Sequence, residues 1–130
     1  MLQLQSFLNI RDNTGVRLVK CIKVLGGFKR RYAFIGDIVV VSVRSIRVRN
    51  KNRFKSEMKI KKGQVIRALI VQTKKTFVRA GGDYVVFSQN TAVLISKDNK
   101  PLGTRVFASV PRELRFHRMM KVASLSGGFI

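Results

Sequence analysis

The chain is poor in the residues that build catalytic and metal sites. It has one cysteine, one histidine and six acidic residues among its 130. Cys21 alone can form neither an internal disulfide nor a CxxC metal cluster, and its isolation indicates a reducing compartment. The acids are scattered, mostly at expected turns, and no two have the spacing of a paired catalytic site. We therefore expect no enzyme, no metal site, no cofactor and no small-molecule substrate.

Long apolar runs are also missing. No stretch of ~18 apolar residues could span a bilayer, and no amphipathic helix with a wide apolar face is apparent. Residues 1–10 have neither an early basic region nor a long apolar core, and they contain no arginine. They resemble neither a secretory signal nor a transit peptide. A membrane is not an expected partner.

The few reactive side chains have ordinary interpretations. His117 lies among arginines and is expected at the surface or facing phosphate. Cys21 lies in the middle of an apolar run, where a small buried core residue is the default. Gly26 and Gly27 precede Lys29, but the GxxxxGK[ST] pattern of a phosphate-binding loop is absent.

Positive charge is the extreme feature of the composition. Lysine and arginine total 27, which gives a formal net charge of +21. Such a balance indicates a polyanionic partner, and nucleic acid comes first because lysine and arginine gain binding free energy by releasing condensed counterions from phosphates. The hydrophobic fraction of 45% nevertheless excludes the composition of a disordered chain.

The chain is organised around residues 18–43, two apolar β-type runs joined by a glycine-containing basic loop. We expect strands at residues 5–10, 17–25, 38–48, 65–71, 84–88 and 91–95, with turns at 11–15, 36–37, 80–83 and 97–101. The apolar alternation changes face between Val43 and Ile46, which predicts a β-bulge. The pattern favours an all-β fold, a closed or nearly closed barrel.

A short helical appendage should follow the barrel. Pro111 suits a first helical position, and Leu114, Phe116 and Met120 are expected to form the packing face of one or two helical turns. We expect a single domain, with the barrel at about residues 1–100 and the appendage at about 104–130. Residues 44–62 are too basic to be buried, so they should project from the barrel as a ribbon or loop.

The basic loops are the candidate RNA-binding surface. Aromatic residues interleaved with them, Phe28, Tyr32, Phe34, Phe54 and Phe77, could be stacking platforms for bases, although Phe28 and Tyr32 could equally pack, and Phe87 is expected in the core. The candidate RNA-binding residues are Arg17, Lys20, Lys23, Lys29, Arg30, Arg31, Arg44, Arg47, Arg49, Lys51, Arg53, Lys55, Lys61, Lys62, Lys74, Lys75, Arg79, Arg112, Arg115 and Arg118.

Several strings, in order along nearly the whole chain, resemble the family of the universal fourteenth protein of the large ribosomal subunit. They are Asp12-Asn13-Thr14-Gly15, Cys21-Ile22-Lys23-Val24-Leu25-Gly26-Gly27, Arg30-Arg31-Tyr32-Ala33, Gly36-Asp37-Ile38, Lys61-Lys62-Gly63, Ala68-Leu69-Ile70-Val71, Thr73-Lys74-Lys75, Gly103-Thr104-Arg105-Val106-Phe107 and Arg112-Glu113-Leu114-Arg115.

The resemblance implies a small five-stranded β-barrel with a projecting ribbon and short C-terminal helices. It implies binding to large-subunit rRNA at the subunit interface, bridges to small-subunit rRNA, and contacts with large-subunit proteins of the third and nineteenth families. The family also binds a ribosome silencing factor through residues that match Thr104, Arg105 and Lys121.

Two departures from the family pattern stand out. Gly81 replaces a preferred Asp, Asn or Ser, and residues 47–58 are longer and more basic than in bacterial members. The insertion points to an organelle-encoded protein of the mitochondrial matrix, with the bacterial cytoplasm as the other localisation. The alternative function is a free-standing barrel that binds single-stranded nucleic acid as a chaperone or regulator.

Overall fold

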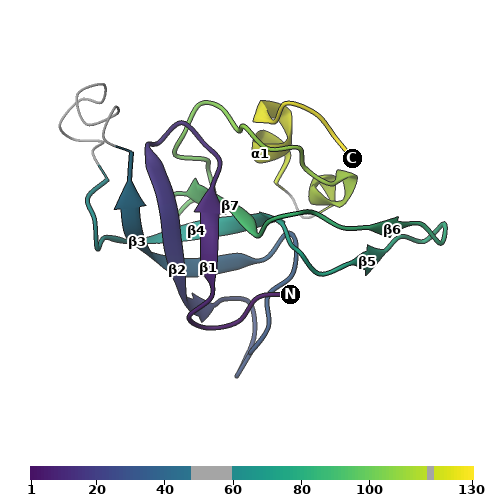
Figure 1. The fold of residues 1–130 in the computed structure, drawn as a ribbon, viewed down its shortest axis with the longest axis horizontal. Coiled ribbons are helices and arrows are strands. Elements are labelled where there is room, and N and C mark those ends of the chain that lie inside the picture. Colours follow the sequence, from purple (N-terminus) through teal and green to yellow (C-terminus); the bar gives the residue numbers. More distant parts are fainter. Residues whose placement is uncertain (48–59, 117–118) are drawn as a thin grey trace.

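A computed structural model describes residues 1–47, 60–116 and 119–130. Its centre is a closed barrel in which neighbouring strands follow the order β1-β2-β3-β4-β7 (Figure 1). Neighbouring strands are antiparallel except β1 and β7, whose parallel pairing closes the barrel. The strands are β1 (Phe7–Ile10), β2 (Val16–Val24), β3 (Ile38–Ile46), β4 (Val65–Gln72) and β7 (Thr91–Ile95). The predicted all-β barrel of five strands is confirmed.

The strand predicted at residues 84–88 is shorter than expected. It is β6 (Tyr84–Val85), which pairs with β5 (Phe77–Val78) in a hairpin that extends away from the barrel (Figure 1). At its tip the Arg79 amide donates to the Asp83 carbonyl at 2.9 Å, and Gly82 has a φ of 87°. That value lies in the left-handed region, which glycine adopts without strain, so the predicted turn at 80–83 is confirmed.

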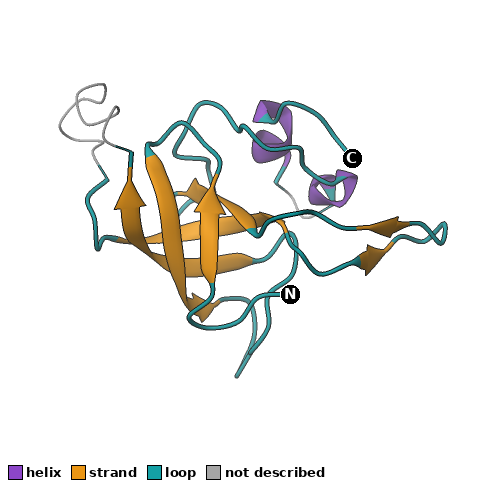
Figure 2. Ribbon diagram, in the orientation of Figure 1, coloured by secondary structure: helices purple, strands orange, loops and turns teal. Residues whose placement is uncertain are grey.

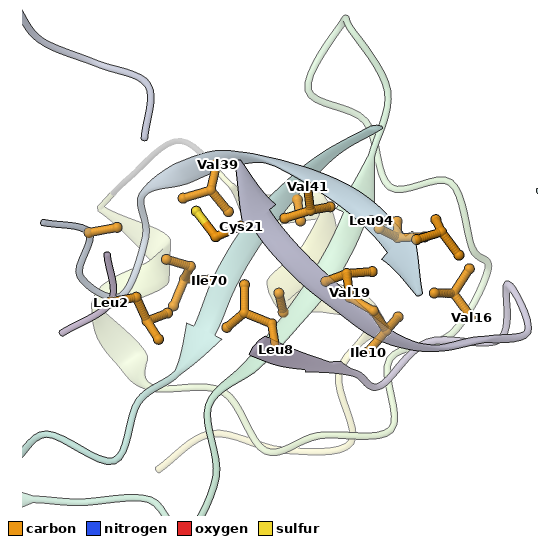
Figure 3. Close-up of a cluster of buried hydrophobic side chains, with 14 of the residues drawn as sticks. Leu2, Leu8, Ile10, Val16, Val19, Cys21, Val39, Val41, Ile70 and Leu94 are labelled. Carbon is orange, nitrogen blue, oxygen red and sulfur yellow. The ribbon is translucent and has the colours of Figure 1, made fainter. Parts of the chain in front are cut away.

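The barrel interior is filled by alternate residues of β2 and β3. Figure 3 shows Cys21 beside Val39, with Leu8 and Ile70 across the interior. All four are buried, because each side chain on the concave face is covered by the other walls of the barrel.

The predicted bulge is present where β3 ends. The β2–β3 register passes from Val19↔Val43 to Leu18↔Ser45, which leaves Arg44 as the extra residue on β3. A second shift, to Val16↔Ile46, leaves Arg17 as the extra residue on β2. Bulges bend the strand and re-aim side chains, and both arginines are exposed here.

Strand β7 and residues 68–71 of β4 are buried on both faces. One face lines the barrel interior, whereas the other packs under the chain that follows β7 (Figure 2). The outward residues of these two strands, Leu69, Val71, Val93 and Ile95, contact a second cluster that includes Val106, Val110, Leu114 and Val122. The expected C-terminal appendage therefore covers the outer face of these strands with a second part of the core, which explains why β7 is apolar at nearly every position.

The C-terminal segment contains two short helices, as predicted, but its packing face differs. They are the 3₁₀ helix η3 (Arg112–Arg115) and α1 (Met120–Leu125). Phe116 is 85% exposed and Met120 is 56% exposed, so the expectation that they pack was wrong. The packed residues are Leu114, Met119 and Val122. The periodicity of one continuous helix does not carry across two short helices of different pitch.

The predicted projecting arm lies mostly outside the described residues. These gaps, residues 48–59 and 117–118, contain the candidate RNA-binding residues Arg49, Lys51, Arg53, Lys55 and Arg118, together with Phe54 and His117.

Candidate nucleic-acid interface

Five candidate cations gather around the end of β3. The Arg47 amide donates to the Gly15 carbonyl at 2.8 Å, which ties the strand end to the β1–β2 turn. The Gly63 amide donates to the Val43 carbonyl at 2.8 Å, which brings the 61–63 turn to the same place. We call the exposed cations of these segments the β3-end group: Arg17, Arg44, Arg47, Lys61 and Lys62.

A second group lies at the opposite end of the barrel. There the start of β3 pairs with the end of β4, and the Gly36 amide donates to the Ile70 carbonyl at 2.9 Å. The turn after β4 is held by the Lys74 amide, which donates to Asn90 Oδ1 at 2.9 Å. The exposed cations of these two loops form the loop-end group: Lys29, Arg31, Lys74 and Lys75.

Other candidates lie on the barrel wall and on the C-terminal segment. Lys20 is half-buried with its ammonium 5.6 Å from the centre of the Phe7 ring, and Lys23 is exposed on the same strand. Arg112, Arg115 and Lys121 are exposed on the two short helices. Exposed cations thus surround the barrel and are not confined to one element.

Arg30 is engaged inside its own loop. Its Nη2 lies 2.5 Å from Asp37 Oδ2, and its other nitrogens donate to the carbonyls of Leu25 and Tyr32 at 3.3 Å each. The same Asp37 oxygen accepts from the Phe34 amide at 2.7 Å. Arg30 therefore braces the β2–β3 loop, and the neighbouring Lys29 and Arg31 carry its exposed charge.

Arg79 is likewise engaged with the C-terminal segment. Its Nε donates to Glu113 Oε1 at 2.6 Å, its Nη2 donates to Oε2 at 3.3 Å, and it also donates to the Ile130 carbonyl. Burial alone would raise the pKa of Glu113. The hydrogen bonds and the charge of Arg79 together outweigh that effect, so the pKa of this carboxyl lies below its usual value. This pair joins the β5–β6 hairpin to η3.

These two contacts are the ion pairs of the described residues, and both occupy arginines. Of the other described acids, Asp12 is buried, while Asp83 and Asp98 lie exposed in turns. The cations of the β3-end and loop-end groups consequently have no carboxylate partner within 1–47, 60–116 and 119–130. The field around these loops is positive.

Asp12 has a structural role that the sequence analysis did not identify. It is 3% exposed, and its carboxylate accepts from the Thr14 amide at 3.0 Å, from the Thr14 hydroxyl and from the Leu94 amide at 3.1 Å. Burial raises the pKa of Asp12, while these hydrogen bonds act in the opposite direction. The aspartate two residues before a threonine is the local signal for such a turn.

The next residue positions the segment matched to silencing-factor binding. Asn13 Oδ1 accepts from the Thr104 amide at 2.8 Å, and Asn13 Nδ2 donates to the Thr104 hydroxyl at 2.5 Å. Val106 pairs with Ser126 directly after α1, the helix that carries Lys121. Thr104, Arg105 and Lys121 are all exposed on these adjoining segments.

The aromatic and thiol side chains divide clearly by burial. Phe28 is 92% exposed at the tip of the basic loop, with the Lys29 ammonium 5.4 Å from its ring centre. Tyr32 is exposed, and Phe87 is half-buried. Cys21 is buried, and burial raises the pKa of its thiol, which fits the predicted core role.

Within the described ranges, no three residues of the His, Cys, Asp and Glu types are grouped so that they could hold a metal ion. None of the helices described is both long enough and apolar enough to cross a membrane.

The comparison with protein families agrees with the resemblance seen in the sequence. The family described as "Ribosomal protein L14p/L23e" matches residues 1–130, the whole chain. This is a family of structural proteins of the large ribosomal subunit and not of enzymes. The chain therefore belongs to the L14p/L23e family, and it is a ribosomal protein of the large subunit.

Proposed function

We propose that this protein binds large-subunit rRNA at the subunit interface and contributes to bridges with small-subunit rRNA. The observation that carries the proposal is the set of exposed cations in the β3-end and loop-end groups, which have no carboxylate partner among the residues that the structure describes. Phosphate contacts fix the position and orientation of a protein on RNA, and selectivity then comes from RNA shape.

The barrel acts as a rigid mount for these loops. Its interior is closed by side chains from all five strands, and the loops at both ends are tied to strand ends by backbone hydrogen bonds. Lys29, Arg31, Lys74 and Lys75 are thereby held before RNA arrives, which reduces the entropy lost on binding. Arg30 and Arg79 position their neighbours, through Asp37 and Glu113, and do not themselves have to contact phosphate.

The test has two parts. In a sucrose gradient at high salt the protein should travel with large subunits, whereas its absence from those fractions would favour the free-standing nucleic-acid-binding module. With an rRNA fragment, the plot of log affinity against log salt should have a slope of several units, because each neutralised phosphate contributes about 0.7 to 0.9. A nearly flat response would refute the electrostatic mechanism.

A matched pair of variants sharpens the salt experiment. Lys61→Gln with Lys62→Gln removes two charges of the β3-end group, and Lys97→Gln with Lys100→Gln removes two exposed charges outside both groups. The first variant should lower the slope by about 1.4 to 1.8, and the second should leave it near wild type. An equal decrease of the slope in both variants would show that RNA affinity depends on the net charge of the protein and not on the position of these lysines.

We also propose neighbours for the assembled protein. They are the large-subunit proteins of the third and nineteenth families and a silencing factor that docks on Thr104, Arg105 and Lys121, which lie exposed on adjoining segments. Arg105→Ala should weaken binding of such a factor without loss of large-subunit assembly, and Lys100→Ala should leave binding unchanged. Unaltered binding by Arg105→Ala would refute the docking site.

The basic segment outside the described residues gives a further test. Ile46 and Ile60, which flank it, pack against the barrel core, so deletion of residues 50–58 should leave the barrel folded while weakening ribosome incorporation. An unfolded deletion variant would contradict a projecting arm. The length and composition of this segment support a mitochondrial ribosome, with the bacterial cytoplasm as the alternative.

A further inference from the structure

A small pocket opens between the β2–β3 loop and the turn that leads from β4 to β5. Its volume is about 250 Å³. Phe34 and Ile35 come from the loop, Thr76 from the turn, Phe77 from the start of β5, and Glu113 from η3. Pockets for small-molecule ligands measure about 300 to 1,000 Å³, so this one suits a single ring system better than a whole cofactor.

Local contacts support the segments that carry the two aromatic walls. The Phe34 amide donates a hydrogen bond to Asp37 Oδ2 at 2.7 Å, and the Asp37 amide donates one to the Phe34 carbonyl at 3.1 Å. On the other side the Arg79 guanidinium carbon lies 6.0 Å from the centre of the Phe77 ring, while Arg79 itself is paired with Glu113. The backbone of Phe34 is therefore held by hydrogen bonds, and the Arg79 guanidinium lies beside the Phe77 ring, before any ligand arrives.

The edge of the pocket is polar and positively charged. Lys75 contributes to the lining, and Lys74 is exposed next to it in the loop-end group. Thr76 also lines the pocket, and its hydroxyl can hydrogen bond to the edge of a ring. Glu113 lines the pocket too, but both of its carboxylate oxygens accept from Arg79. Phe34 is 51% exposed and Thr76 is exposed, so the pocket can be reached from outside.

We infer that this pocket accepts one unstacked nucleobase of rRNA, whose flanking phosphates contact Lys74 and Lys75. Aromatic walls favour the face of a base, polar groups favour its edge, and the lysines match its backbone. A purely apolar side chain would leave Lys74 and Lys75 beside the pocket without a matching partner. The inference rests on the proposed rRNA binding and adds a base contact to what are otherwise phosphate contacts.

Single-stranded RNA heptamers test this directly with the full chain. One strand carries adenine at its centre between abasic spacers, and the other is abasic throughout, so they differ by one base. Wild-type protein should bind the adenine strand about 5- to 150-fold more tightly, the range that loss of one stacked base gives.

Two variants change the pocket in opposite ways, one by removing a wall and the other by filling the space. An effect shared by both therefore reports on the pocket and not on the loss of a packed side chain. Phe77→Ala removes one wall, whereas Thr76→Phe fills the space from an exposed position and removes no buried atom. Both should abolish the preference for adenine while keeping the salt dependence. Phe107→Ala removes an exposed aromatic ring that does not line the pocket and should keep the preference.

The outcomes are distinct for the two proposals. Equal binding of both strands by the wild type, with a steep salt dependence, overturns the pocket inference but leaves rRNA binding standing. Failure to bind either strand at low salt overturns the proposed function itself. If both pocket variants bind the strands as the wild type does but no longer travel with large subunits, a neighbouring protein occupies the pocket and the nucleobase assignment is wrong.

Discussion

Replacing Asp12 with alanine should lower the free energy of unfolding by about 1 to 3 kcal/mol. The substitution leaves the amide of buried Leu94 without its acceptor, which costs about 1 to 3 kcal/mol. The bond from the Thr14 amide contributes about 0.5 to 1.5 kcal/mol more. Removing a buried carboxylate offsets part of this loss, because burial disfavours its ionised form.

Thermal unfolding followed by circular dichroism measures the effect. For a chain of this length, 1 kcal/mol corresponds to a change of about 4 °C in Tm, so Asp12→Ala should melt roughly 4 to 12 °C lower. Asp98→Ala is the matched control because it makes the same change of net charge at an exposed turn. Equal melting temperatures for the two variants would refute a stabilising role for the Asp12 hydrogen bonds.

The deficit of Asp12→Ala should also depend on pH in a defined direction. The pKa of Asp12 is raised in the folded protein above its ordinary 3.8. The proton-linked part of its contribution to stability is therefore complete below that ordinary pKa and is lost as pH rises through the folded pKa, whereas the hydrogen bonds that the carboxylate accepts still contribute. Urea unfolding at about pH 7 and about pH 4 should show a larger deficit at the lower pH, and a smaller one would contradict the shift.

Three further substitutions test other contacts. The pKa of Glu113 is lowered from its ordinary 4.5, so its contribution is present above that value and is lost on acidification; the stability deficit of Glu113→Gln in urea should shrink as pH falls, opposite to Asp12→Ala. Thr91→Val should raise the free energy of unfolding by about 1 kcal/mol in urea, because its buried hydroxyl has no hydrogen-bond partner among the described atoms. Gly103→Ala should lower Tm through a loss of about 1 to 3 kcal/mol, since a Cβ there would overlap the Asn13 carboxamide oxygen; an unchanged Tm would show that Asn13 can move aside.

Local pattern predicted the barrel well, because strand alternation and bulges leave direct traces in the sequence. The face change between Val43 and Ile46 corresponds to the bulge at Arg44. The burial of β7 on both faces was harder to predict, since a run of apolar residues does not show what covers the outer face. Here it is covered by residues such as Leu114 and Val122.

The charge pattern located the basic loops but did not distinguish exposed cations from paired ones. Arg30 meets an acid seven residues away, whereas Arg79 meets one 34 residues away. Only the closing of the loop and the docking of η3 bring these partners together. The pocket has the same origin, since Phe34 lies in the β2–β3 loop and Phe77 in β5, and these segments meet only when β3 pairs with β4.

The parallel pairing of β1 with β7 has a consequence for the time at which the protein becomes folded during its synthesis. The hydrogen bond from the Leu94 amide to the Asp12 carboxylate joins residues that are 82 positions apart in the sequence. The outer face of β7 is covered by residues as far along the chain as Val122. Contacts between such distant segments form slowly, because a long loop must close before they stabilise anything. A nascent chain that stops before β7 leaves β1 and β4 with unpaired edges, which can pair with other chains. The barrel therefore closes only after Ile95 has been made, and the outer face of β7 is covered only after Val122 has been made.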